Sequence, residues 1–215
     1  MRHHRGVPID AFSAFDPYGG AAPPELLSGH LLVATPRLVD PNFARRVVLV
    51  VDHGGHGALG VVIDRPGGVA VGELLPQWHP LATPPAELFT GGPVARNALI
   101  GLARLTSRDG ADAVPAPIGW RLLVDAEHPV GTVDLSADPG LLADSIVGVR
   151  LFSGYAGWDS GQLEDEIREG SWYVMPAEAR DPISADPEGL WRRVLRRQGG
   201  ALAVVGGFPA DPAMN

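Results

Sequence analysis

The sequence predicts one domain of the α/β or α+β class over about residues 26–208. Its 215 residues are 45% hydrophobic and 20% charged, which is the composition of a globular chain. Short β-branched apolar runs outnumber the stretches with helix punctuation, and the two kinds alternate along the chain. No fixed-period repeat or heptad pattern interrupts this alternation. Residues 1–25 are predicted as a flexible arm and residues 209–215 as a short tail.

Six apolar runs have the length and composition of buried strands. In chain order they are Leu31–Ala34, Val47–Val51, Ala58–Ile63, Ala98–Leu105, Trp120–Val124 and Val130–Leu135. The Gly54-Gly55 pair separates the second run from the third and predicts a tight hairpin, because glycine tolerates the positive φ of such turns. Residues 90–93 predict another turn, and residues 67–85 and 108–119 predict Pro-containing loops, the first with a short helix at Val71–Leu75.

Helix signals are fewer than strand signals. Asp-Pro pairs, which fit an N-cap followed by Pro at the first helical position, predict a turn over 42–45, a helix from Asp138 through Ile146, and a last helix from Asp186 to Gly199-Gly200. Asp159 and Gln162 form a capping-box-like pair ahead of a helix over Leu163–Ile167. The last helix has an apolar stripe, and we interpret the arginines opposite it as a solvated face. These arginines are Arg192, Arg193, Arg196 and Arg197.

Composition and charge exclude several chemistries. The chain has no Cys, which removes disulfides, thiolate nucleophiles and zinc–thiolate sites. All 17 basic residues are Arg, so the chain lacks a Schiff-base lysine and the lysine of a P-loop. The net charge of −8 disfavours a dominant nucleic-acid surface. No apolar stretch approaches the ~20 residues that span a bilayer, and no signal-peptide core is present, so we expect a cytoplasmic protein without membrane contact.

The segment Asp-His-Gly-Gly-His over 52–56 is the first whose side chains are candidates for metal binding or catalysis. If the two glycines form the hairpin turn, His53 and His56 face each other with Cβ atoms ~5 Å apart, close enough to share a metal ion or a proton. Asp52 points to the opposite face, because strand side chains alternate. A metal site needs a third ligand from elsewhere in the chain. The alternative, which we favour, is two polar residues beside a solvated turn.

Two glycine-rich segments follow. Gly91-Gly92-Pro93 predicts a sharp turn that either accepts an anion on its backbone N–H groups or, as we favour, reverses the chain. Residues 153–164 are predicted to run from a strand through a glycine-rich loop into the capped helix. A helix N-terminus attracts anions, but Asp159 and Glu164 already complement this one and repel a phosphate. The spacing matches no nucleotide-binding motif, and we interpret Trp158 as a packing anchor.

Several separate motifs also occur in a fixed order. They are Gly29-His30-Leu31-Leu32-Val33-Ala34-Thr35-Pro36, Asp40-Pro41-Asn42-Phe43, Asp52-His53, Gly57-Ala58-Leu59-Gly60, Arg65-Pro66, Gly91-Gly92-Pro93, Gly154-Tyr155-Ala156-Gly157-Trp158 and Gly161-Gln162-Leu163-Glu164, with Glu166 and Trp172. In this succession the chain resembles the bacterial YqgE/AlgH family over about residues 29–200. The resemblance implies a single domain with a mixed, barrel-like β-sheet, small and closed, flanked by helices. It implies no established activity, although the AlgH name reflects a proposed regulatory role in alginate production.

The chain departs from the family pattern at three places. Asp52 stands where the family commonly has Glu, and Asp64 stands where it commonly has Asn. A Leu-His pair that often follows the Gly-Gly-Pro motif is Leu102-Ala103 here. The missing second histidine weakens a catalytic or metal-binding role that needs both. His56 lies outside the family motif.

We therefore expect a binding or regulatory module that acts through an unknown protein or small-ligand partner, with no catalytic residue, metal or cofactor assigned. The candidate surface, chosen because function concentrates on strand-end loops, is Asp52, His53, Gly91, Gly92, Pro93, Gly157, Trp158, Gln162 and Glu164. The alternative is a metal-assisted or hydrolase-like enzyme that uses His53 with Asp52, Asp64 or Glu164. A DNA-binding transcriptional regulator is less favoured because of the net charge, and homo-oligomerisation stays open.

Overall fold

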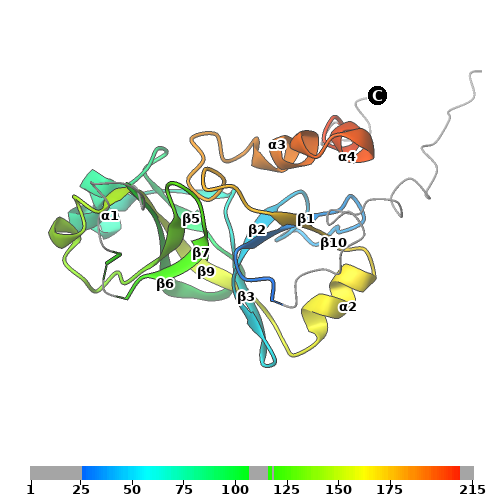
Figure 1. Cartoon of the computed structure of the whole chain (residues 1–215), viewed down its shortest axis with the longest axis horizontal. Coiled ribbons are helices and arrows are strands. Elements are labelled where there is room, and N and C mark those ends of the chain that lie inside the picture. Colours follow the sequence, from blue (N-terminus) through cyan, green and yellow to red (C-terminus); the bar gives the residue numbers. More distant parts are fainter. Residues whose placement is uncertain (1–25, 107–115, 118, 209–215) are drawn as a thin grey trace, which may run out of the picture.

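The computed structural model describes residues 26–106, 116–117 and 119–208, which fold around a ten-stranded sheet (Figure 1). The strands are β1 (His30–Ala34), β2 (Val47–Gly54), β3 (Gly57–Val62), β4 (Pro66–Ala70), β5 (Glu87–Thr90), β6 (Val94–Leu105), β7 (Arg121–Val124), β8 (Val130–Val133), β9 (Ile146–Trp158) and β10 (Trp172–Pro176). The α-helices are α1 (Val71–Leu74), α2 (Gln162–Arg168), α3 (Leu190–Arg197) and α4 (Gly200–Val205), and the 3₁₀ turns are η2 (Pro76–Leu81) and η3 (Pro139–Leu141). The predicted arm and tail, and most of the predicted loop over 108–119, lie outside the described residues.

One half of the molecule is a layer of β10, β1, β2 and β3 between helices, with α2 on one face and α3 and α4 on the other (Figure 1). Because both faces are covered, the apolar runs of β1 and β2 are buried continuously. Leu31 and Val33 belong to the core that includes α3 and α4, whereas Leu32 and Ala34 belong to the core that includes α2. The indole N–H of Trp191 donates to the carbonyl of Ala34 at 2.9 Å and ties α3 to β1.

The other half is a curled half-barrel that shares β9 with the first half (Figure 1). One end of β9 pairs with β3, and the rest pairs with β6 in an antiparallel and with β5 in a parallel register. β8 and β7 continue the curl from β6, while β4 pairs with β5. A third core fills this half, with Trp78 of η2 fully buried. The predicted fold class is confirmed: a mixed α/β structure with a barrel-like sheet flanked by few helices.

Most predicted elements are confirmed, although several bounds differ. All six predicted strands occur, and β2 continues to Gly54 while β6 begins already at Val94. The helix after the capping-box pair is α2, and the helix with the apolar stripe is α3. The side chain of Asp40 accepts from the backbone N–H of Asn42 at 2.8 Å and starts the predicted turn over 42–45.

Two predictions in the second half of the chain are wrong. Residues 138–146 form only η3 and turns, and Ile146 already opens β9. Residues 153–158, predicted as a loop, are the last part of β9. Gly154 there serves close packing instead of a turn: a Cβ on this residue, whose φ is +71°, would lie 2.7 Å from the carbonyl oxygen of Gly92. The elements that were not predicted are β4, β5, η2, β10 and α4.

Candidate functional site

The β2–β3 hairpin turns at Gly55 and His56, one residue later than the Gly54-Gly55 pair indicated. His53 consequently lies opposite Ala58, and His56 is exposed at the tip. The predicted facing pair of His53 and His56 is therefore wrong, because a shift of one residue moves His56 out of the ladder. The solvated-turn alternative describes His56 only, since the His53 side chain is 6% exposed.

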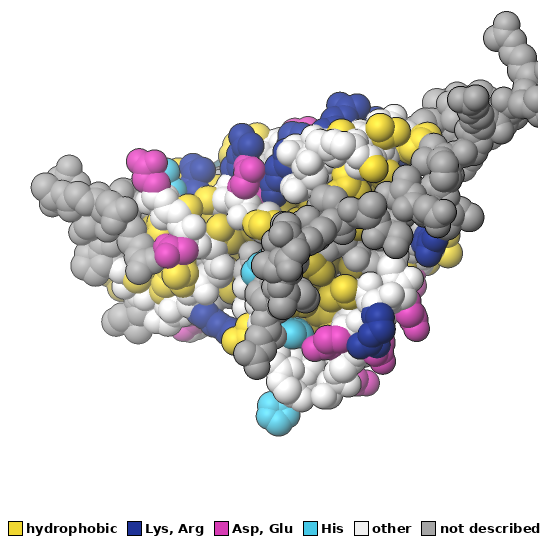
Figure 2. Space-filling model, turned by 45° about the vertical axis from the view of Figure 1, so that its right-hand side comes forward, with side chains coloured by type: hydrophobic (Ala, Val, Ile, Leu, Met, Phe, Trp, Pro, Cys, Tyr) yellow, Lys and Arg dark blue, Asp and Glu magenta, His cyan; other side chains and the backbone are white. Residues whose placement is uncertain are grey.

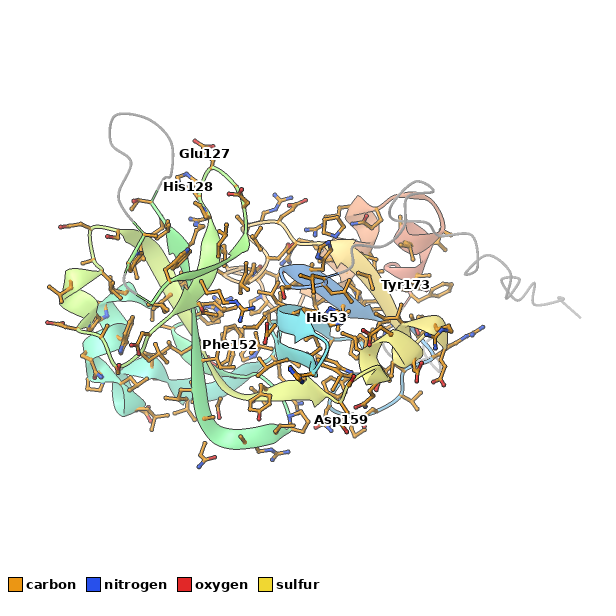
Figure 3. The ribbon with its side chains drawn as sticks, turned by 60° about the horizontal axis from the view of Figure 1, so that its bottom comes forward. His53, Glu127, His128, Phe152, Asp159 and Tyr173 are labelled. Atoms are coloured by element: carbon orange, nitrogen blue, oxygen red, sulfur yellow. The ribbon has the colours of Figure 1, made fainter. Side chains whose placement is uncertain are left out.

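His53 lies where β2 meets α2, and both of its ring nitrogens are engaged (Figure 3). Nδ1 accepts from the backbone N–H of Leu27 at 3.2 Å, and Nε2 lies 3.1 Å from Oε1 of Glu164. Only an unprotonated nitrogen accepts a hydrogen bond, so Nδ1 carries no proton and the Nε2–H group donates to Glu164. His53 thereby ties the chain before β1 to α2, and neither nitrogen is open to a substrate.

Glu166 of α2 organises the aromatic residues around that helix. Its Oε2 accepts from the indole N–H groups of Trp158 at 2.9 Å and Trp172 at 2.8 Å. Its Oε1 accepts from the amide of Gln162 at 2.9 Å. The Gln162 side-chain oxygen in turn accepts from the backbone N–H of Asp159 at 3.0 Å. The predicted pair of Asp159 and Gln162 therefore occurs, but the N-cap of α2 is Gly161, which has no side-chain cap. Trp158 is a buried packing residue.

Asp52 points to the other face of β2, as strand alternation predicts. The Nη2 of Arg121, on β7, donates to Oδ1 of Asp52 at 2.5 Å. This hydrogen bond holds the pKa of Asp52 below its usual value. The side chains of Asp52 and Arg121 are 60% and 52% exposed, so solvent and ligands reach both. Because β2 and β7 do not pair as strands, the ion pair links the two sides across the opening of the half-barrel.

An open groove of about 470 Å³ lies beside this ion pair, between β2 and β3 on one side and β6, β7 and β8 on the other. It is lined by Val51, Asp52, Leu59, Leu99, Ile100, Gly101, Arg121, Thr132, Val133, Asp134, Leu135 and Ser136. Apolar side chains from β2, β3, β6 and β8 form its walls. The Ser136 hydroxyl and backbone N–H both donate to Asp134, which lowers the pKa of that carboxyl and keeps it ionised.

The Gly-Gly-Pro segment over 91–93 connects β5 to β6 and packs on β9. The Gly91 N–H donates to the carbonyl of Ser153 at 2.8 Å, and the Gly91 carbonyl accepts from the N–H of Val62 at 2.8 Å. A Cβ on Gly92 would lie 2.1 Å from the carbonyl carbon of Tyr155. The segment therefore reverses the chain in close contact with β9, and the Gly91 N–H is used inside the protein.

The candidate residues fall into three places. His53, Trp158, Gln162 and Glu164 gather around α2, Asp52 faces the groove on the other side of β2, and residues 91–93 pack on β9. Gly157 is exposed beside Trp158 at the end of β9. Among the described residues, no three His, Asp or Glu side chains come together as a metal site would need. Glu127 and His128 lie in the loop between β7 and β8, far from His53 (Figure 3).

Three buried charged residues, Asp64, Arg150 and Asp181, were not recognised as such from the sequence. Asp64 is fully buried; its Oδ1 accepts from the backbone N–H of Val47 at 3.2 Å, and its Oδ2 has no hydrogen-bond partner. Burial raises the pKa of Asp64 to about 7. Arg150 is 2% exposed in the middle of β9. The signal for it was a single arginine inside the apolar run from Ile146 to Phe152.

The arginines of α3 differ from a uniform basic face. Arg192 and Arg196 are exposed, but Arg193 forms an ion pair with Asp186 and Arg197 one with Asp181 at 2.8 Å. Arginine side chains line the upper edge of the molecule in Figure 2, where Figure 1 shows α3 and α4, and acidic side chains lie among them. The paired arginines fit a mixed surface better than a continuous phosphate-binding track.

Known proteins resemble this chain over nearly its whole length. A family profile described as AlgH-like matches residues 31–203. The chain belongs to this AlgH-like family. A UPF0301 protein of Streptomyces coelicolor is 51% identical over 189 residues, which cover 88% of this chain and 95% of that protein. A UPF0301 protein of Mycobacterium avium is 42% identical over 198 residues, 92% of this chain and 96% of that protein.

Two solved structures share the fold of this AlgH-like protein. The crystal structure of protein DIP2367 from Corynebacterium diphtheriae is 31% identical, with a TM-score of 0.81 over 94% of this chain and 100% of that one. The solution structure of the AlgH protein from Pseudomonas aeruginosa is 30% identical, with a TM-score of 0.57 over 89% of this chain and 98% of that one. In the described part of the chain, no helix has the length and apolar character to cross a membrane.

The departures from the family pattern now have places in the fold. Ala103, which stands where the Leu-His pair would have its histidine, is fully buried in the core of the half-barrel. Asp64 stands where the family commonly has Asn, and it is buried with one unpartnered oxygen. Asp52, in place of Glu, reaches Arg121 across the opening. The cytoplasmic location and a role in regulation stay predictions.

Proposed function

We propose that this AlgH-like protein is a binding module whose ligand is a small molecule with an apolar body, held in the groove beside the Asp52–Arg121 pair. This proposal rests on the volume and the position of the groove. Its volume of about 470 Å³ falls in the range of small-molecule sites, which run from roughly 300 to 1,000 Å³. It also opens where the curled sheet does, and ligand sites recur at the mouths of β-barrels.

The lining suits a ligand with one apolar and one polar side. Leu59, Leu99 and Ile100 offer apolar surface that an apolar ligand would remove from water. Asp52 and Arg121 stand at the edge, where their exposed groups orient the polar end of the ligand by hydrogen bonds. None of the described residues that line the groove is a histidine, and His53 lies on the other face of β2 with both nitrogens engaged. The groove therefore supports binding of a ligand, and none of its described lining residues supplies a histidine general base.

A fluorescent dye tests the groove without knowledge of the natural ligand. The probe is 8-anilinonaphthalene-1-sulfonate, which has an apolar ring system and a sulfonate that pairs with Arg121. We expect saturable binding to the native protein. Leu99→Glu should weaken the dye about tenfold, because it puts a charge into the apolar wall. Leu122→Glu is the matched control, since both leucines are 40% exposed and Leu122 does not line the groove.

The outcomes separate this proposal from its alternatives. Equal dye binding by the native protein and by Leu99→Glu would show that the groove is not the ligand site. A native protein that binds no dye, and whose dimers are dissociated by Leu99→Glu but not by Leu122→Glu, would place a second copy of the chain in the groove. That result would replace the small-ligand function by a protein contact.

A further inference from the structure

A second cavity, of about 430 Å³, lies away from the groove and shares no lining residue with it. It is lined by Thr83, Pro84, Arg104, Arg180, Asp181, Ile183, Ser184, Ala185, Arg193 and Arg197. Arg104 comes from β6, and Arg193 and Arg197 come from α3, so the cavity lies between the half-barrel and the helix that covers the other half. Four of its ten lining residues are arginines, against one carboxylate.

Three of the four arginines are neutralised by nearby carboxylates. Arg197 lies 2.8 Å from Asp181 and 3.5 Å from Glu178, Arg180 lies 2.7 Å from Glu178, and Arg193 pairs with Asp186. Both oxygens of the lining carboxylate, Asp181, are already used: one accepts from Arg197 and the other from the backbone N–H of Glu178 at 2.8 Å. These pairs occupy three of the four arginines, and the lining carboxylate, Asp181, pairs with Arg197 and not with Arg104.

Arg104 is the exception in this wall. Among the described residues it forms no ion pair, and its Nε is buried without a hydrogen-bond partner. The rest of the Arg104 guanidinium makes no hydrogen bond within the described residues either. A charged donor without an acceptor costs free energy, so an anion in the cavity that accepts from its Nη groups would stabilise the protein. Arg104 is therefore the group of the wall that a bound anion would satisfy.

Arg150 adds a second uncompensated charge behind the wall. It is 2% exposed; its two Nη groups donate to the carbonyls of Pro84 at 2.7 Å and Ser184 at 2.8 Å, and its Nε has no partner. Its guanidinium carbon lies 4.3 Å from the ring centre of Phe89, which packs edge-on against Phe152 in the interior (Figure 3). Desolvation lowers the pKa of Arg150 only to about 10, so the side chain stays charged at neutral pH.

Strand pairing places Arg150 and Arg104 on the same face of the sheet. Arg150 of β9 pairs with Leu102, and Arg104 pairs with Gly148, two residues along each strand. Cross-strand partners point to one face, so the two guanidinium groups are diagonal neighbours. Like charges in that relation repel unless an anion lies between or above them. Because Arg150 also holds the carbonyls of Pro84 and Ser184, those two lining residues do not turn free acceptors toward an anion.

We propose that this cavity binds a small phosphate ester, with Arg104 donating to the phosphate and Arg150 supplying positive charge from behind the wall. Guanidinium groups bind oxyanions through paired N–H donors, and phosphate is their common partner. A tetrahedral phosphate accepts from several directions, which suits arginines that come from different elements. The volume exceeds that of a bare ion and matches a small organic molecule, because ligand sites begin at roughly 300 Å³.

The test uses inorganic pyrophosphate as the probe and isothermal titration calorimetry as the readout, with the full chain in a phosphate-free buffer. We expect Arg104→Gln to weaken pyrophosphate about tenfold or more, since one charge-assisted hydrogen bond contributes that much. Arg192→Gln is the matched control: it removes the same charge from the exposed side of α3, outside the cavity, and should leave the affinity unchanged. Ala185→Glu adds a negative charge at an exposed lining position and should abolish binding without disturbing the core.

Each remaining outcome decides against the proposal. Equal weakening by Arg104→Gln and Arg192→Gln would show general surface attraction. No binding of pyrophosphate by the native protein would remove the site. Citrate that binds more tightly than pyrophosphate, with the same loss in Arg104→Gln, would replace the phosphate ester by a polycarboxylate. If Arg104→Gln does not fold, full pyrophosphate affinity in Ala185→Glu would overturn the site by itself.

Discussion

The burial of Asp64 predicts how the stability of the protein depends on pH. Its side chain is fully buried at the end of β3, one oxygen accepts a hydrogen bond from Val47, and the other oxygen has no partner. Burial raises its pKa from 3.8 to about 7. The folded state therefore binds this proton more tightly than the unfolded state does. The free energy of unfolding must fall as pH rises through this range, because folding opposes the loss of the proton.

The magnitude follows from the shift. At about 1.4 kcal/mol per pKa unit, a rise from 3.8 to about 7 means that ionised Asp64 costs about 4 kcal/mol above pH 7 and nothing below about pH 4. Between pH 5 and pH 8, linkage gives a loss of about 2–3 kcal/mol from this group. Asp64→Asn keeps the acceptor for Val47 but cannot ionise. The variant should therefore gain about 2–3 kcal/mol relative to the native protein when the pH changes from 5 to 8.

Urea unfolding of both proteins at pH 5 and pH 8 measures this difference, and all other titrating groups cancel. Asp52→Asn is the control: the pKa of Asp52 is lowered from 3.8 by Arg121, so its stabilisation is lost only below about pH 4, and this variant should keep the same stability difference from the native protein at pH 5 and pH 8. A stability difference between Asp64→Asn and the native protein that is the same at both pH values would refute the burial argument. A native protein whose free energy of unfolding rises relative to that of Asp64→Asn between pH 5 and pH 8 would refute it as well.

Two further predictions concern the packing around β9 and α2. Gly92→Ala should destabilise the protein by about 3 kcal/mol in the same urea experiment, because its Cβ would lie 2.1 Å from a backbone carbon. Gly55→Ala is the control: its Cβ would meet nothing within 4 Å, so its stability should stay within about 0.5 kcal/mol of that of the native protein. Glu166→Ala should cost about 3 kcal/mol, because two buried indole N–H groups lose their acceptor. Tryptophan emission should change with it, and an unchanged spectrum and stability would contradict the assignment of Trp158 and Trp172 to Glu166.

Local patterns predicted those parts of the fold that local physics determines. The apolar runs of β1 to β3 and β6 to β8 are short, β-branched and bounded by turn residues, and these properties do not depend on the rest of the chain. The last half of β9 was missed because its glycines are typical of loops, and Gly154 is explained only by its close contact with Gly92. β10 begins two residues after Gly170, and α4 begins at Gly200 itself. Both glycines were interpreted as helix ends, so the start of each element was missed.

The candidate site was predictable only in part, for a similar reason. Strand alternation correctly placed Asp52 and His53 on opposite faces of β2. Their partners come from distant elements: Arg121 lies on β7 and Glu164 on α2, and no local pattern joins them. The groove and the arginine-lined cavity arise from the curl of the sheet and the docking of α3. Arg150, buried between strands, was hidden by the apolar run that surrounds it.

Native mass spectrometry of the untagged protein, purified without added ligand, tests the binding function most directly. We expect a small-molecule adduct on the native protein that is lost in Leu99→Glu and kept in Leu122→Glu, since Leu99 lines the groove and Leu122 does not. A native protein with the bare chain mass, or one whose every adduct survives Leu99→Glu, would contradict the proposed ligand site.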